Sequence, residues 1–155
     1  MLQQIIIEAL EKMENEDFLS STYIASGRDT VADILGATAE FHLLLDNKDT
    51  SLPLLRARYR SNVDKMTDSA RLAYFVVIGL ARDKQMTSEL ISYLKRSLNI
   101  DRSTILSPWH PFMHGMHALE KITGGAIRSP DSGGTTKEFD RFLDQAADWA
   151  KADNK

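Results

Sequence analysis

The chain has 155 residues, of which 43% are hydrophobic and 26% charged, and its net charge is −3. This composition is ordinary for a globular protein, and the longest apolar run, Leu72 to Ala81, is about half the length that spans a bilayer, so neither disorder nor a membrane class is expected. The absence of cysteine and of a secretory leader pattern over residues 1–10 favours a cytoplasmic protein without disulfides or thiolate metal sites.

Two helices are predicted at the start of the chain. Residues 2–15 carry apolar side chains at helical spacing, namely Leu2, Ile6, Leu10 and Met13. A short helix over 18–26 follows, and Gly27 is expected to end it because glycine tolerates a left-handed terminus.

A third and a fourth helix are expected next. Thr30 and Asp33 resemble a capping box, with aspartate in place of the usual glutamate, and open a helix that we expect to end near Asp46. Residues 47–51 form a polar link, and Pro53 then fits the first turn of the fourth helix.

The element over residues 69–82 is the most ambiguous. Taken alone, its run of aromatic and β-branched residues is also typical of a buried strand. We favour a central helix because the apolar stretch 72–81 continues through Leu80 and because helices are predicted on both sides. Thr67 or Asp68 is its expected N-cap.

Three more helices are expected towards the C-terminus. Met86 and Ile91 suggest a hydrophobic staple around a Thr87 N-cap, and Pro108 and Pro111 bracket the start of the next helix. Residues 124–134, GGAIRSPDSGG, form the predicted flexible loop. Thr135 and Glu138 form a capping box for a last helix, after which residues 152–155 are expected to fray.

About seven helices joined by short links predict a single all-α domain over 1–155, packed as successive helix pairs. The apolar helix, turn and Leu-rich helix over Ser69–Leu98 resemble one HEAT-type repeat. The stretch 118–124, the loop with Asp131 and the helix ending in Trp149 are similar to the closing segment of small HEAT-like bacterial proteins. This resemblance implies a HEAT-like α-solenoid or an irregular bundle, of a type found among contact-dependent inhibition immunity proteins.

Charge is distributed unevenly along the chain. Residues 1–50 hold three Lys/Arg against ten Asp/Glu, whereas residues 51–110 hold ten Lys/Arg against five Asp/Glu. A solvated helix face is the simplest interpretation of the acidic third, and a docking surface for a basic protein is the functional one. We expect a partner to contact six of these carboxylates, namely Glu11, Glu14, Glu16, Asp17, Asp33 and Glu40.

The sequence offers two alternative kinds of site. His110, His114 and His117 fall within a narrow arc of a helix and could share a metal ion, but no HExxH pattern accompanies them. The basic middle could contact nucleic acid, yet Arg56, Arg58 and Arg60 point around a helix and not along one face, which disfavours that alternative.

The sequence contains no GxxxxGK[ST] loop, no GxSxG elbow and no supported catalytic pair of carboxylates, so we expect neither an enzyme nor a resident cofactor. The resemblance favours an immunity protein that binds and neutralises a cognate bacterial toxin, such as a nuclease, through a charged surface. A metal-binding helical protein and a nucleic-acid-associated regulator are the alternatives.

Overall fold

A computed structural model describes residues 1–26 and 30–153, and these residues contain helices, turns and no strand. The all-α prediction is therefore confirmed. The elements in chain order are α1 (Leu2–Glu14), α2 (Phe18–Ser26), α3 (Val31–Gly36), α4 (Ala39–Asp46), α5 (Lys48–Asn62), α6 (Asp68–Ala81), a 3-10 turn η1 (Lys84–Met86), α7 (Thr87–Ser97), α8 (Arg102–Ile105), α9 (Pro111–Ile122) and α10 (Thr136–Asp153).

The described ranges hold ten α-helices, and the expected count of about seven is not confirmed. One reason is Thr38, which splits the predicted third helix into α3 and α4. Its hydroxyl donates to the Leu35 carbonyl at 2.8 Å and accepts from the Phe41 amide at 3.3 Å, so it ends one helix and caps the next. The short helix α8 is another addition.

Two predicted helix starts were wrong. Helix α5 begins at Lys48, within the expected polar link. Ser51 of this segment is fully buried and donates to the Leu44 carbonyl at 2.6 Å, and Pro53 lies inside the helix. Thr87 does not cap α7 but is its first residue, and its hydroxyl donates to the Lys84 carbonyl at 2.7 Å.

Other predicted boundaries were correct. Thr67 caps α6 by accepting from the Ala70 amide at 3.2 Å, and residues 72–81 are helical, so the strand alternative is excluded. Thr135 and Glu138 form the predicted capping box, accepting from each other's amides at 3.1 and 3.4 Å. Helix α10 extends to Asp153 and so contains residues 152 and 153, the first two of the tail that we expected to fray. Gly27 and residues 154–155 lie outside the described residues.

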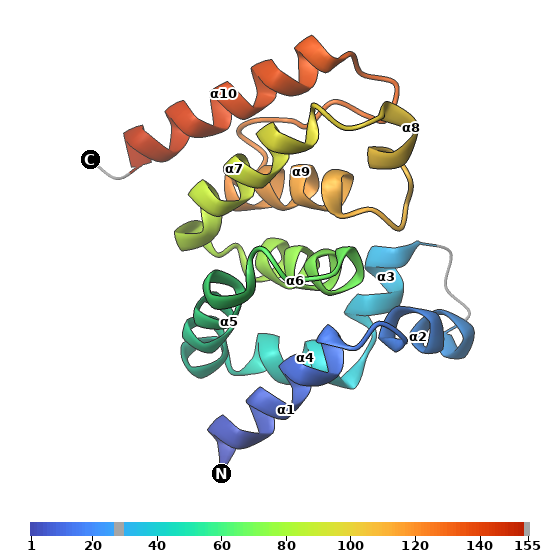
Figure 1. The fold of residues 1–155 in the computed structure, drawn as a ribbon. Helices are drawn as coiled ribbons and strands as arrows, with labels where there is room; N and C mark the ends of the chain where they lie inside the picture. Colours follow the sequence, from blue (N-terminus) through green and yellow to red (C-terminus); the bar gives the residue numbers. More distant parts are fainter. Residues whose placement is uncertain (27–29, 154–155) are drawn as a thin grey trace.

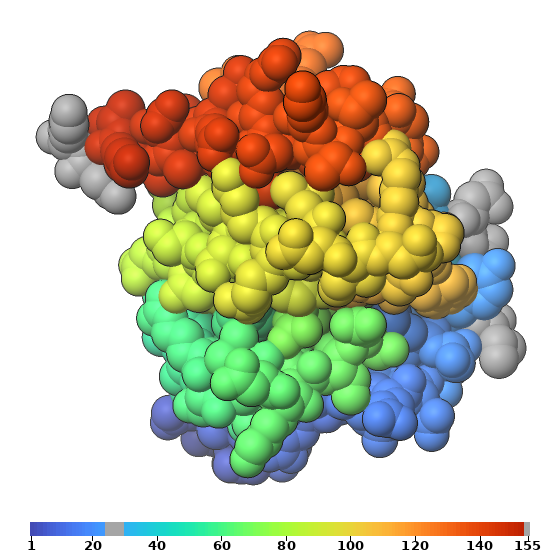
Figure 2. Space-filling model, turned by 45° about the horizontal axis from the view of Figure 1, so that its top comes forward, coloured from blue at the N-terminus to red at the C-terminus, as the bar shows by residue number. Residues whose placement is uncertain are grey.

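Helix α6 occupies the centre of the fold (Figure 1). Helices α1, α2, α4 and α5 lie on one side of it, α7 to α10 lie on the other, and α3 lies beside its end. The space-filling view shows the same tiers, with α10 across the top (Figure 2). Every residue of α6 from Arg71 to Gly79 is buried, which is typical of a helix that is packed on all sides.

Helix α9 makes the most extensive helix-to-helix contact in the molecule, with α6. Small residues allow the close approach: a Cβ atom on Gly79 would lie 2.9 Å from the Cα of Ala118. Gly115 lies one turn before Ala118 on α9, and a Cβ atom on it would lie 2.9 Å from Leu94 of α7 and 3.1 Å from Phe75 of α6. The buried hydrophobic residues of both tiers form one cluster through this contact. Within the described residues, no helix is long and apolar enough to cross a membrane.

The close approach of α6 and α9 predicts that Gly79→Ala destabilises the protein by about 1–3 kcal/mol, because the new methyl group overlaps backbone that cannot move freely. Urea unfolding would measure the loss. Gly36→Ala is the matched control, since the nearest atom to its added Cβ lies 3.9 Å away, and it should be neutral or stabilising. Equal effects of the two substitutions would contradict the close approach.

Candidate functional site

Four of the six predicted partner-binding carboxylates are exposed, and in residues 1–26 and 30–153 they form no ion pair. We call these four the acidic surface: Glu11, Glu16, Asp17 and Asp33. Glu11 lies on α1, Glu16 and Asp17 form the turn into α2, and Asp33 lies in the first turn of α3. All four therefore belong to the N-terminal tier and remain open to solvent.

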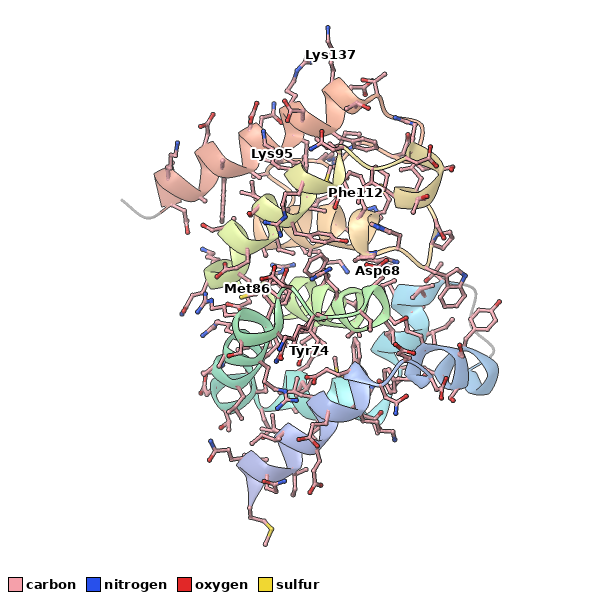
Figure 3. All side chains as sticks on the ribbon, viewed as in Figure 1. Asp68, Tyr74, Met86, Lys95, Phe112 and Lys137 are labelled. Carbon is pink, nitrogen blue, oxygen red and sulfur yellow. The ribbon has the colours of Figure 1, made fainter. Side chains whose placement is uncertain are left out.

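Glu14 has a different role, because it faces the interior. Its carboxylate accepts two hydrogen bonds from Arg58 of α5, at 2.7 and 2.8 Å, and a third from the Tyr74 hydroxyl of α6. In Figure 3, Tyr74 lies on the side of α6 that faces these N-terminal helices. Burial acts to raise the pKa of Glu14, but the hydrogen bonds from Arg58 and Tyr74 outweigh it and lower the pKa. Glu14 thus joins three helices and is not available to a partner.

Glu40 is less exposed than the acidic surface but, unlike Glu14, its ion pair is with an exposed lysine. It forms an ion pair with Lys12 at 2.6 Å, which links α4 to α1. The pair lies in a groove of about 380 Å³ that also includes Asp17 and Phe18. Of the predicted carboxylates, the fold therefore brings Asp17 and Glu40 to one groove.

Half of the ten basic residues in the middle of the chain form internal ion pairs. Arg56 binds the buried carboxylate of Asp83 through two hydrogen bonds of 2.9 Å, and Arg60 pairs with Glu89 at 2.7 Å. Lys95 of α7 contacts Asp140 and Asp144 of α10 at 2.9 and 2.5 Å. These pairs neutralise part of the positive charge that a phosphate backbone would need, which weighs against the nucleic-acid alternative.

The three histidines have separate roles. His110 is buried and caps α9, because its Nδ1 accepts from the Phe112 amide at 3.1 Å. His114 Nε2 lies 2.9 Å from the Pro108 carbonyl and donates to it, whereas His117 is exposed. Across the part of the chain that the structure describes, no three His, Asp or Glu side chains come together in a way that could hold a metal ion. The geometry therefore gives the metal-binding alternative no support.

His114 and His117 do share a pocket of about 460 Å³ between α3, α6 and α9. Phe75, Val76 and Ala118 give it apolar walls, and its polar lining includes Arg82, Glu120 and Lys121. Arg82 has a positive φ of 53°, a left-handed conformation that is uncommon for a residue with a side chain. Sequence reasoning missed this pocket because its basic residues come from different helices. In the sequence, these basic residues are distinguished only by their positions near the C-termini of helices, where cations are favoured.

Comparison with known proteins finds no matching family model, no matching curated protein and no matching solved structure.

The lowered pKa values of three histidines predict a loss of stability below about pH 6.5, the ordinary histidine value. Burial lowers the pKa values of His110, His114 and His117, so the unfolded chain takes up protons before the folded one does. Stability from these groups is complete above pH 6.5 and is lost as the pH falls towards the lowered pKa values. Urea unfolding between pH 7.5 and 5 would measure it.

His110→Asn is the informative variant, because asparagine can still cap α9 but does not titrate. It should lose less stability than the wild type between pH 6.5 and 5. Identical pH profiles of the two proteins would show that His110 does not contribute through its protonation.

Proposed function

We propose that this chain is a non-catalytic protein-binding module, and that it acts as an immunity protein that neutralises a cognate bacterial toxin with a basic surface. The observation that carries the proposal is the imbalance of charge in the N-terminal tier. Among residues 1–26 and 30–50, only Glu14 and Glu40 of the many acidic residues form ion pairs. The remaining carboxylates, with the acidic surface among them, give this tier a net negative field.

Exposed apolar residues lie next to these carboxylates. Leu2 and Ile5 of α1 are 41% and 43% exposed, and Glu8 and Glu11 follow them on the same helix. An apolar centre with a polar rim is the usual composition of a protein interface. The acidic rim would select a basic partner and speed its association, while the apolar side chains would lose contact with water on binding.

The mechanism that we infer requires no chemistry by this chain. A nuclease binds an anionic substrate through basic residues, and the acidic surface would occupy those residues in place of the nucleic acid. The HEAT-like stacking of helix pairs that the sequence resembles belongs to the same proposal, because stacked helix pairs present extended surfaces to protein partners.

The test is co-expression with the products of the neighbouring genes, followed by calorimetry of this chain with any product that is toxic on its own. The proposal expects protection of the cells and a complex whose affinity falls with salt. The Glu11→Gln, Glu16→Gln double variant should bind about tenfold more weakly, with most of the loss in the association rate at low salt.

Asp64→Asn, Asp148→Asn is the matched control. Both residues are exposed, both lack ion pairs among the described residues, and the change in net charge is the same. Affinity equal to that of the wild type is expected. If the control weakens binding as much as the test variant does, the acidic surface is not the docking site. If no neighbouring gene product is bound or neutralised, the immunity function is wrong.

A further inference from the structure

The pocket between α3, α6 and α9 is separate from the acidic surface, and the proposed function does not use it. Its volume of about 460 Å³ lies within the range of about 300–1,000 Å³ that is usual for small-molecule sites. Ala32 of α3, Val76 and Gly79 of α6 and Ala118 of α9 all line it, and α3 lies beside the end of α6 (Figure 1). A molecule in this pocket would therefore contact segments that are far apart in the sequence.

One wall of the pocket is apolar and belongs to the packed core. Val76 and Ala118 are 5% and 2% exposed, whereas Ala32 is partly exposed. The aliphatic stem of Lys121 extends across this wall, since its Cδ atom lies 3.6 Å from the position that a Cβ atom on Gly79 would occupy. Because packing holds these residues in place, the wall exists before any ligand arrives, and such preorganisation lowers the cost of binding.

Two basic side chains give the pocket its positive charge. They are Arg82, which follows the end of α6, and Lys121, near the end of α9. Across residues 1–26 and 30–153, neither of them forms an ion pair. Glu120 is the acidic residue in the lining, so two positive charges face one negative charge. The lining therefore has a net positive charge when its histidines are neutral.

The two histidines of the pocket lie close to Lys121. Burial is the main cause that lowers the pKa values of His114 and His117, and the positive charge of Lys121 lowers both further. Both imidazoles are therefore neutral at neutral pH. His114 is held by its hydrogen bond to the Pro108 carbonyl, whereas His117 is exposed, and a neutral imidazole has one N–H with which to donate to a ligand.

We propose that this pocket binds a small organic anion that carries one carboxylate on an apolar body. The carboxylate accepts charge-assisted hydrogen bonds from Arg82 and Lys121 and a further one from His117, and charge-assisted bonds are the stronger ones in proteins. The apolar body packs against Ala32 and Val76. A single negative charge matches the net charge of the lining, whereas an inorganic anion would leave the apolar wall uncovered. This site does not depend on the proposed function.

The experiment titrates the full chain with three probes at neutral pH and constant ionic strength, and follows backbone amide shifts by NMR. Sodium phenylacetate carries an aromatic ring and a carboxylate, sodium acetate carries the charge without the ring, and benzyl alcohol carries the ring without the charge. Phenylacetate should give saturable shifts at residues 76–82 and 114–121, with a dissociation constant of about 1 mM, a modest binding energy per atom for so small a ligand. Acetate and benzyl alcohol should each bind about tenfold more weakly or not at all.

Substitutions in the lining test which groups hold the ligand. Lys121→Gln and Arg82→Gln should each weaken phenylacetate binding about fivefold, because each removes one charged donor. Lys151→Gln, which removes an exposed charge from α10, is the matched control and should bind as the wild type does. Ala32→Leu should abolish the saturable shifts, because the larger side chain fills the pocket, and urea unfolding checks that this variant folds.

The proposal is overturned if phenylacetate gives no saturable shifts around the pocket, or if Lys121→Gln and Arg82→Gln both bind it as tightly as the wild type does. Equal affinities for benzyl alcohol and phenylacetate would show that the positive charges take no part. Equal affinities for acetate and phenylacetate would show that the apolar wall takes no part. Either of these equalities also contradicts the proposal.

Discussion

The burial of α6 on all sides is the constraint on which the rest of the fold depends. From Arg71 to Gly79 the helix exposes almost nothing, so neither tier can form its core without it. One side receives α1 and α4, α3 packs beside the end, and the other side receives α9, which approaches closely because Gly79 faces Ala118. Since apolar burial is the main favourable term in folding, the two tiers depend on each other through this helix.

The same central position organises the charges. Tyr74 of α6 donates to Glu14, which Arg58 also binds, so one network ties α1, α5 and α6 together. Arg56 is fixed in a similar way by the buried carboxylate of Asp83, just after the end of α6. These central ion pairs use Arg56 and Arg58, and of the carboxylates over 1–26 and 30–50 only Glu14 and Glu40 form ion pairs, so most of the negative charge of the N-terminal tier stays uncompensated. The proposed function depends on this uncompensated negative charge.

Local signals in the sequence were enough to predict most of the helices. The apolar spacing in α1 and the caps at Thr67 and Thr135 depend only on neighbouring residues, and the structure confirms them. Thr38 was missed because its apolar flanks continue the same helical period across the break. The fully buried Ser51 was missed because a hydroxyl with a polar neighbourhood in the sequence resembles a link.

The candidate sites depended more on tertiary contacts, and the sequence could not supply these. Glu14 was indistinguishable from Glu11 and Glu16 until the fold brought Arg58 and Tyr74 to it. His110 was grouped with His114 and His117 by spacing, but the turn before α9 makes it a cap.

Native-state hydrogen exchange tests the central role of α6 most directly. If both tiers need this helix, amides from Leu72 to Ile78 should exchange only when the whole protein unfolds, with a free energy equal to that from urea unfolding. Exchange of these amides through a smaller opening, while α1 or α9 stays protected, would show that one tier folds without α6 and would contradict the account.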